Sequence, residues 1–233
     1  MLSDYLNQFN ISLTETDVAL LDRHLDFVLE KNKALRLTAI HDYNAGVKLH
    51  ILDSLLVLEE LQNAPQGLML DIGTGGGYPG IPLSVATGRP VVLLDSVKKK
   101  IHAINEFVER ESQLKLSVST LDLRAEELAN ERPEGFAVVL ARAVSSLPSL
   151  VELASPLLFD GGQLIAHKGP LNEEELDRAN KVAALTGMEY FSSREYVLPD
   201  GEELRTVYVF KKINKGEVDL PRRSGQAQRK PLA

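Results

Sequence analysis

The 233-residue sequence contains no cysteine. Without cysteine the chain can form neither disulfide bonds nor thiolate metal sites, and it has no cysteine nucleophile. No metal site is therefore expected. No apolar run approaches the roughly 18 residues that a membrane-spanning helix needs, and Met1–Asn10 lacks the basic start and apolar stretch of a secretory signal. These absences predict a cytoplasmic protein with no membrane partner.

Positive charge is also in short supply, because 26 Lys and Arg residues face 33 Asp and Glu residues and leave a net charge of −7. Such a chain does not coat nucleic acid through bulk electrostatics. Basic residues nevertheless gather in Lys98–Lys100 and in the acid-free end Pro221–Ala233. Solvated lysines and a frayed tail are one explanation. The other is local contact with a polyanion through Lys98, Lys100, Arg222, Arg223, Arg229 and Lys230.

The order of apolar patterns predicts an α/β fold. Thr14–Asp17 resembles a capping box and precedes an amphipathic helix to about Lys33, and a second helix is expected from Asp42 to Leu61. From Leu68 onward, short strand-like runs alternate with helical segments. The predicted strands are Leu68–Ile72, Val91–Asp95, Lys115–Thr120, Phe136–Ala141 and Gly162–Ala166.

The last predicted strands have a different arrangement. Glu189–Leu198 and Leu204–Ile213 flank Pro199-Asp200-Gly201, which predicts a β-hairpin. Alternating strands and helices followed by a hairpin are typical of a Rossmann-like, seven-stranded sheet with mostly parallel strands and an antiparallel edge. We expect a helical extension over residues 1–66 packed on the core, a sheet domain over 67–214 and a basic tail over 215–233. Because such sheets bind ligands beyond the carboxyl ends of their strands, the residues after each strand are the candidates.

A glycine-rich turn, Asp71–Tyr78, follows the first predicted strand. Glycines let the backbone approach a ligand where a Cβ would collide. Gly75, Gly77 and Gly80 match the dinucleotide pattern, which sets a pyrophosphate on a helix N-terminus. Gly73, Gly75 and Gly77 match the methyltransferase pattern, which faces an adenosyl amino acid. The turn alone therefore fits two cofactors.

Acidic residues after the strands bear on that choice. Asp71 can bind a cationic α-amino group and would repel a pyrophosphate, although it could also cap backbone amides. Asp95 can accept the ribose hydroxyls of either cofactor, or cap the helix that starts near Ser96. Ala125 and Glu126 follow the third strand, where adenine usually lies. Asp71 thus favours S-adenosylmethionine over NAD(P).

The fourth strand ends in Arg142-Ala143-Val144. Many enzymes that methylate exocyclic amines have an Asn/Asp-Pro-Pro-aromatic turn at this place, and this chain lacks it, which argues against an exocyclic amine as the methylated atom. Methylation of pyrimidine C5 needs the cysteine that this chain lacks. A ring nitrogen remains, because its in-plane lone pair can attack a methyl group without losing a proton. Arg142 can contact guanine, a phosphate or the cofactor carboxylate, and Lys168 can neutralise a phosphate. Surface ion pairing or solvation of these cations is the alternative, as is a core position for His50.

These segments together resemble the small-subunit ribosomal RNA methyltransferase G family, also called glucose-inhibited division protein B. The resemblance spans nearly the whole chain and is carried by His50–Leu55, Asp71–Leu83, Leu94–Ser96, Arg142-Ala143, Lys168-Gly169 and Pro221–Leu232. It implies a class I methyltransferase fold with S-adenosylmethionine as cofactor. It also implies N7 methylation of one guanine in bacterial 16S ribosomal RNA, with the RNA or the small-subunit particle as partner. We expect a monomer.

The resemblance also assigns roles to residues. It implies cofactor contacts at Gly73, Tyr78, Ala125-Glu126 and Arg142. With the turn and the strand ends, the expected cofactor set is Asp71, Gly73, Thr74, Gly75, Gly77, Tyr78, Asp95, Ser96, Ala125, Glu126 and Arg142. Arg142 and Lys168 are the expected catalytic residues, and His50 joins the two basic patches as an expected RNA contact.

The chain departs from the family pattern at three places. Arg36-Leu37-Thr38 stands where the family usually has Asn-Leu-Thr, Tyr78 replaces a common Phe, and Gly76 stands where Ala or Pro is frequent. Two other functions stay open. The Gly75-x-Gly77-x-x-Gly80 register suits an NAD(P)-dependent oxidoreductase, although no constellation for hydride transfer is evident. A non-catalytic RNA-binding assembly factor could also retain the fold.

Overall fold

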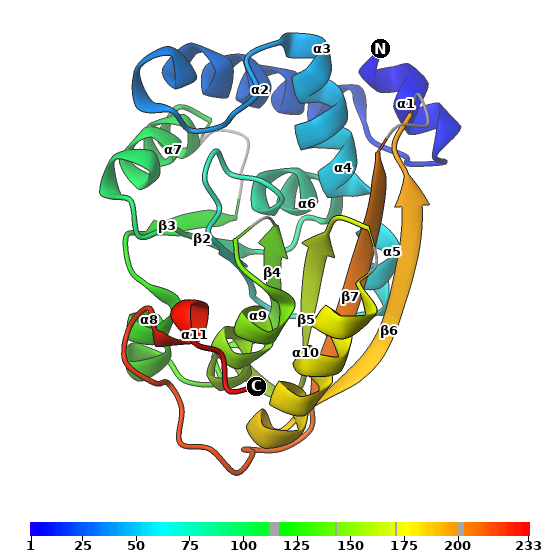
Figure 1. The fold of residues 1–233 in the computed structure, drawn as a ribbon. Coiled ribbons are helices and arrows are strands. Elements are labelled where there is room, and N and C mark those ends of the chain that lie inside the picture. Colours follow the sequence, from blue (N-terminus) through cyan, green and yellow to red (C-terminus); the bar gives the residue numbers. More distant parts are fainter. Residues whose placement is uncertain (112–116, 143, 171, 200–202) are drawn as a thin grey trace.

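The structure is a computed structural model that describes residues 1–111, 117–142, 144–170, 172–199 and 203–233. Its sheet has seven strands, which are β1 (Met69–Ile72), β2 (Val91–Leu94), β3 (Val118–Leu121), β4 (Phe136–Arg142), β5 (Leu158–Lys168), β6 (Met188–Val197) and β7 (Leu204–Lys212). They lie in the order β3-β2-β1-β4-β5-β7-β6 (Figure 1). Strands β1 to β5 are parallel to one another, and β7 is antiparallel to both β5 and β6. The predicted fold class is confirmed.

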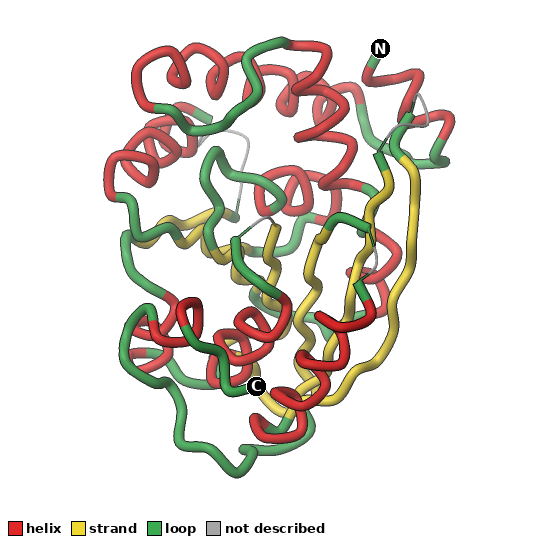
Figure 2. Tube along the Cα trace, viewed as in Figure 1, coloured by secondary structure: helices red, strands yellow, loops and turns green. Residues whose placement is uncertain are grey.

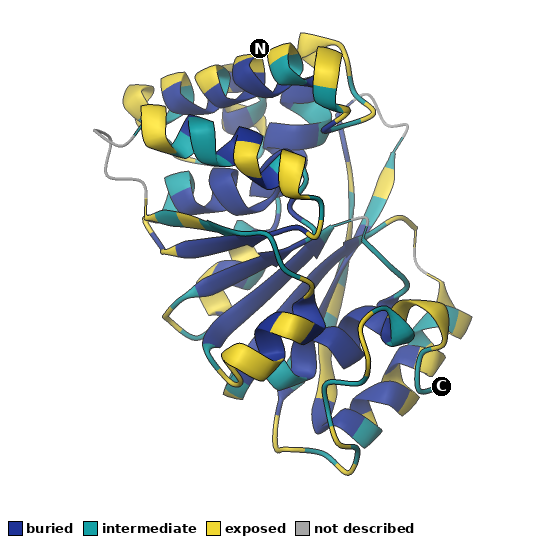
Figure 3. Cartoon of the chain, turned by 90° about the vertical axis from the view of Figure 1, so that its left-hand side faces the viewer, coloured by how far each residue is buried: buried dark blue, intermediate teal, exposed yellow. Residues whose placement is uncertain are grey.

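Helices cover both faces of the sheet (Figure 2). One face carries α1 (Leu2–Gln8), α2 (Glu15–Leu35), α3 (Tyr43–Gly46), α4 (Asp53–Leu55), α5 (Leu58–Asn63), α6 (Gly80–Thr87) and α7 (Lys98–Arg110). The other carries α8 (Ala125–Glu131), α9 (Leu147–Ala154), the 3-10 turn η3 (Ser155–Leu157), α10 (Glu173–Thr186) and α11 (Gln226–Arg229). The sheet is the buried layer between them (Figure 3).

Burial on both faces explains the uninterrupted apolar strands. In β4, Val138 and Leu140 pack into the core beneath the N-terminal helices, whereas Val139 and Ala141 pack into the core beneath α8 to α10. Successive side chains of a strand point to opposite faces, so a strand covered on both sides is apolar at every position. This arrangement leaves the polar residues at the ends of the strands.

The first long helix begins as predicted. Thr14 Oγ1 accepts a hydrogen bond from the Asp17 amide at 3.2 Å, and Asp17 Oδ2 accepts one from the Thr14 amide at 3.0 Å, which closes the capping box. The helix ends at Leu35, and its C-cap residue Arg36 has φ of 52°. Asn adopts this left-handed conformation more readily than Arg, which gives a physical reason for the family's usual Asn.

The second predicted helix starts at Asp42 as expected, because Asp42 caps α3, but its predicted continuity is wrong. After α3 the chain makes a π-helical turn, η1 (Val47–Leu52), continues as α4, and breaks before α5. The Leu49 carbonyl accepts a hydrogen bond from Arg142 of β4, and the His50 carbonyl accepts one from the Ser54 hydroxyl. The hydrogen bond to Arg142, 93 residues away, cannot be detected from a helical periodicity, and both hydrogen bonds accompany the change of pitch.

The hairpin prediction is confirmed, since β6 pairs with β7 from Met188↔Lys212 to Val197↔Leu204. Asp200 and Gly201 of its turn lie outside the described residues, as do Ala143, Lys115 and Leu171. Strand β5 is longer than predicted, because it begins at Leu158. None of the described helices has both the length and the hydrophobicity that crossing a bilayer requires.

Candidate active site

The glycine-rich turn joins β1 to α6 and is closely packed. The Gly73 and Thr74 amides donate to the Leu94 carbonyl at the end of β2, at 2.7 and 3.0 Å. Gly73 has φ of 70°, and a Cβ there would lie 2.6 Å from Val144 Cγ2. A Cβ on Gly77, with φ of 92°, would lie 2.6 Å from the Ile81 side chain. Both positions therefore require glycine for conformation and for space.

Asp71 lies at the end of β1 and is fully buried. Its Oδ2 accepts hydrogen bonds from the Thr74 hydroxyl at 2.7 Å and from the Gly80 amide at 2.9 Å. Its Oδ1 has no partner among the described residues. Burial raises the pKa of Asp71 to about 7, against the opposing effect of those two hydrogen bonds. The carboxylate thus caps the turn with one oxygen, while its other oxygen is buried without a hydrogen-bond partner among the described residues.

The Gly80 contact also bears on the dinucleotide register. Gly80 is the first residue of α6, and its amide is one of the free donors that a pyrophosphate would use. The Asp71 carboxylate already binds that amide. A pyrophosphate at this helix start would meet a carboxylate in its place, so the geometry disfavours NAD(P) here.

A first cavity, of about 210 Å³, opens beyond the ends of β1, β2 and β3. Its lining is Ile72, Gly73, Leu94, Asp95, Ser96, Leu123, Arg124, Ala125, Glu126, Val144, Leu153 and Gln228. Asp95 Oδ2 accepts from the Gly75 amide at 3.1 Å and Asp95 Oδ1 from the Val97 amide at 2.9 Å, which fixes the carboxylate at the rim. Gly73, Asp95, Ser96, Ala125 and Glu126, all expected at the cofactor, are therefore brought together.

Three more of the expected cofactor residues, Thr74, Gly77 and Tyr78, lie behind the turn. Thr74 and Gly77 are buried, and Tyr78 is stacked between two histidines, with ring centroids 4.6 Å from His24 and 4.4 Å from His50. His24 Nε2 lies 2.8 Å from the Gly76 carbonyl, so helix α2 supports the turn from below. These residues shape the turn rather than line the first cavity.

Arg142 and Lys168 line a second cavity, of about 400 Å³. The other lining residues are Thr38, Ala39, Ile40, Leu49, His50, Asp53, His167, Gly169 and Arg205. This cavity lies between the helical extension and the ends of β4 and β5. Val144 lines the first cavity and Arg142, two residues earlier, lines the second, so the two sites adjoin at the end of β4.

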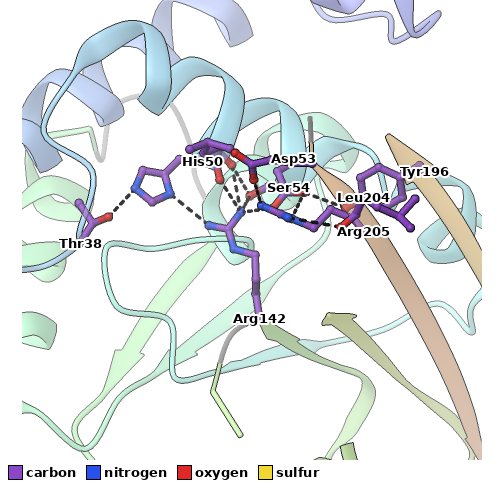
Figure 4. A network of polar contacts seen from close by, with 10 residues as sticks. Thr38, His50, Asp53, Ser54, Arg142, Tyr196, Leu204 and Arg205 are labelled. Carbon is purple, nitrogen blue, oxygen red and sulfur yellow. Dashed lines mark hydrogen bonds and ion pairs between the residues drawn. The ribbon is translucent and has the colours of Figure 1, made fainter. Parts of the chain in front are cut away.

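Arg142 points from β4 toward the π-helical turn (Figure 4). One guanidinium nitrogen, NH1, donates to Asp53 Oδ2, Ser54 Oγ and the Leu49 carbonyl, each at 3.2 Å. Asp53 is 3% exposed, and its Oδ1 accepts from the Tyr196 hydroxyl at 2.8 Å. The arginine therefore joins the sheet to the extension and neutralises a buried carboxylate.

His50 lies between Arg142 and Thr38. Arg142 NH2 is 3.4 Å from Nδ1, and Thr38 Oγ1 is 2.7 Å from Nε2. Because arginine only donates, Nδ1 accepts and Nε2 carries the proton. Burial and the positive charge of Arg142 lower the pKa of His50 to about 3. The imidazole is neutral at pH 7, so it can offer hydrogen bonds but no positive charge.

Lys168 ends β5 and is mostly buried. Its Nζ donates to the Ser145 carbonyl at 3.0 Å and pairs with Glu175 Oε1 at 2.9 Å. The same Glu175 oxygen accepts from the Leu147 amide at the start of α9. Lys168 thus reaches the second cavity with part of its charge already offset.

The predicted RNA contacts differ in exposure and in their partners. Lys98 is 77% exposed and lies 3.5 Å from Asp122, and Lys100 is half-buried on the same helix. In the tail, Arg223, Arg229 and Lys230 are exposed. Arg222 differs, because its Nε and NH2 each lie 2.6 Å from the carboxylate of Glu152. The Arg222 guanidinium is occupied by a protein carboxylate rather than free for a phosphate.

Sequence reasoning missed Gln228, Glu152 and Arg205. Nothing marks Gln228 in the sequence, yet it lines the first cavity from the far end of the chain. The sequence indicates Asp53 and Ser54 only as members of the family segment His50–Leu55. Their Arg142 contacts form across 89 and 88 residues, and no local pattern signals them.

The chain matches the family described as rRNA small subunit methyltransferase G over residues 17–199. It is 35% identical to the ribosomal RNA small subunit methyltransferase G of Carboxydothermus hydrogenoformans, over 99% of this chain and 98% of that protein. It is 39% identical to the protein of the same name from Caldicellulosiruptor bescii, over 91% of each.

The fold has solved counterparts as well. A geranyl diphosphate methyltransferase in complex with GPP and sinefungin is 12% identical, with a TM-score of 0.55 over 69% of this chain and 76% of that one. At this identity the likeness concerns the fold alone.

The sequence matches run through both cavities and nearly the whole chain. By these matches, the chain belongs to the rRNA small subunit methyltransferase G family.

Proposed function

We propose that this chain transfers the methyl group of S-adenosylmethionine to N7 of a guanine in 16S ribosomal RNA. The observation that carries the proposal is the pair of adjoining cavities at the carboxyl ends of the parallel strands. Carboxylates at the first suit an adenosyl amino acid, and cations at the second suit a nucleotide. The donor and the acceptor would thus meet near Gly73 and Arg142.

The residues at the first cavity fit the donor. Asp95 offers carboxylate oxygens for the ribose hydroxyls, and the Ala125 backbone with Glu126 would lie at the adenine. The unpartnered Oδ1 of Asp71 would accept a hydrogen bond from the α-ammonium group. Glycines of the turn leave the space that a Cβ would fill. When bound, S-adenosylmethionine supplies a methyl group activated by its sulfonium charge.

The chemistry asks the protein for position rather than for a base. The N7 lone pair lies in the plane of the guanine ring and forms the new N–C bond, while the sulfur keeps the electron pair of the breaking S–C bond. No proton leaves, so the neutral His50 need not remove one. Arg142 and Lys168 would orient guanine O6 and a neighbouring phosphate, and Asp53 would offset the positive charge that the base gains.

The basic residues would hold RNA around this site. Helix α7 starts with Lys98, Lys99 and Lys100 and has no acid in its first turn. Cations are unfavourable at a helix N-terminus, and a phosphate there would offset that cost. Lys98, Lys100, Arg223, Arg229 and Lys230 would contact phosphates, with His50 as an uncharged base contact. Arg222 takes no part in this proposal because Glu152 binds it.

Methyl transfer to ribosomal RNA tests the proposal. Purified protein with labelled S-adenosylmethionine is expected to label 16S RNA, as naked RNA or in the small-subunit particle, when the RNA comes from a strain without this gene. Mapping of the labelled RNA should find one N7-methylguanosine, at a position where RNA from the parent strain already carries this modification. Cofactor binding without any incorporation into either substrate would contradict the proposal.

The turn itself gives a sharper prediction. Gly73→Ala is expected to weaken S-adenosylhomocysteine binding by about tenfold or more, because the turn would shift in the free protein to relieve roughly 1–2 kcal/mol of strain at this φ and the collision of the Cβ with Val144, and binding would have to restore the original turn. Calorimetric titration measures the change. Val144→Ala alone should bind S-adenosylhomocysteine nearly as tightly as wild type. The double variant with Gly73→Ala and Val144→Ala should recover only the part of the lost affinity that the collision causes. Full recovery would show that backbone strain plays no role.

A further inference from the structure

The C-terminal segment 222–233 is folded against the domain. Figure 1 shows α11 beside α8 and α9. Ala227 is 1% exposed, and its carbonyl accepts from the Ser149 hydroxyl at 2.9 Å. The terminal Ala233 carbonyl accepts from Arg178 at 3.0 Å. A basic tail that only tethered RNA would need none of these contacts.

Two buried carboxylates hold the segment in place. Glu152 on α9 is 2% exposed; it accepts both hydrogen bonds from Arg222 and a third from the Leu232 amide at 3.2 Å. Glu126 on α8 accepts from the Gly225 amide at 2.6 Å. A buried carboxylate without its partner costs several kcal/mol, so the fold favours the docked segment. Glu126 also lines the first cavity, which ties the segment to that site.

Docking places Gln228 in the wall of the first cavity, which residues at the ends of β1 and β2 also line. Its side-chain amide makes no hydrogen bond among the described residues, although neighbouring side chains of the segment are bonded. A primary amide offers one acceptor and one donor side by side, and the edge of adenine carries the matching N6 donor and N1 acceptor.

We propose that Gln228 binds the adenine edge of the cofactor, so that the C-terminal segment is part of the cofactor site. The inference rests on the proposed function in one respect, the presence of the adenosyl group in the first cavity. The inference adds a residue of the C-terminal segment to the proposed cofactor site. The segment would then bind cofactor in addition to the RNA contacts proposed for its exposed cations. Arg222 and Glu152 act as positioning residues for this contact.

The test compares two glutamines of the same helix. Gln228→Ala and Gln228→Glu are expected to raise the Kd for S-adenosylhomocysteine by about tenfold, since each loses the amide donor and the second keeps the size of the side chain. Gln226→Ala and Gln226→Glu, which change a residue outside the cavity lining, should stay within about twofold of wild type. RNA affinity, measured without cofactor, should be equal in wild type and the two alanine variants, and any loss caused by the added carboxylate should be the same in Gln228→Glu and Gln226→Glu.

Calorimetry and filter binding separate the outcomes. If wild type binds S-adenosylhomocysteine and the Gln228 variants bind it equally well, the inference is wrong while the proposed function stands. If the Gln228 variants lose RNA affinity instead, the segment serves RNA and the inference is also wrong. If wild type itself does not bind S-adenosylhomocysteine, the proposed function fails, and the inference fails with it.

Discussion

Asp71→Asn is expected to lower the affinity for S-adenosylhomocysteine by about tenfold to one hundredfold without destabilising the ligand-free protein. A hydrogen bond between charged groups contributes roughly 1.5–3 kcal/mol, and the variant loses the charge that faces the α-ammonium group. Asn can still accept from the Gly80 amide and the Thr74 hydroxyl, which Asp71 Oδ2 does now. Titration calorimetry and thermal unfolding measure the two effects.

The direction of the stability change follows from the pKa. Burial raises the pKa of Asp71 from 3.8 to about 7 in the folded protein. A raised carboxyl pKa means that its contribution to stability is complete below pH 4 and is lost as the pH rises toward 7. The ligand-free variant should therefore unfold at or above the wild-type temperature at pH 8. A large loss of stability at pH 8 would contradict this account.

The same carboxyl predicts a pH dependence of binding. Wild-type affinity for S-adenosylhomocysteine should fall as the pH drops below about 7, because the protonated carboxyl cannot pair with the ammonium group. The Asp71→Asn variant should show no such dependence between pH 5.5 and 8. A pH profile shared by both proteins would assign the titration to another group.

In cells, full function of a variant that no longer binds cofactor would favour the assembly-factor alternative.

The sequence was sufficient for the sheet because the strands are buried on both faces. Runs such as Val91–Leu94 and Phe136–Ala141 are apolar at nearly every position, and the residues after them are polar. The order of these runs, with Pro199 between the last two strands, was enough to predict a parallel sheet with an antiparallel edge. The Thr14 capping box is also local and was found for that reason.

The features that escaped prediction depend on partners far along the chain. The helix after Asp42 has a regular apolar pattern, but its carbonyls and Ser54 bind Arg142 and the helix changes pitch. Arg222 was assigned to RNA because it lies in a basic stretch, whereas its partner Glu152 lies 70 residues earlier. Gln228 carries no charge and no motif. Only the folded chain brings it to the first cavity.

The second large effect is expected at Arg142. Arg142→Ala removes the nearer of the two cations beside Asp53, which is 3% exposed; the other, Arg205 Nε, lies 3.8 Å from its Oδ1. The change also leaves the Leu49 carbonyl and the Ser54 hydroxyl without the arginine as donor. Breaking one side of a buried ion pair costs about 3–5 kcal/mol, so the variant should be strongly destabilised and inactive. Loss of activity in this variant alone would therefore say little about catalysis.

Adding Asp53→Asn to Arg142→Ala separates the two roles. The double variant contains no unpaired buried charge, so chemical denaturation should show a smaller loss of stability than the sum of the two single changes. If Arg142 orients the guanine, methyl transfer at saturating cofactor should stay at least about one hundredfold below wild type in this more stable protein. Asp53→Asn alone keeps the guanidinium and should retain much more activity. A double variant that regains both stability and methyl transfer would make Arg142 a structural link between the sheet and the extension and would leave Lys168 as the remaining proposed contact of the guanine.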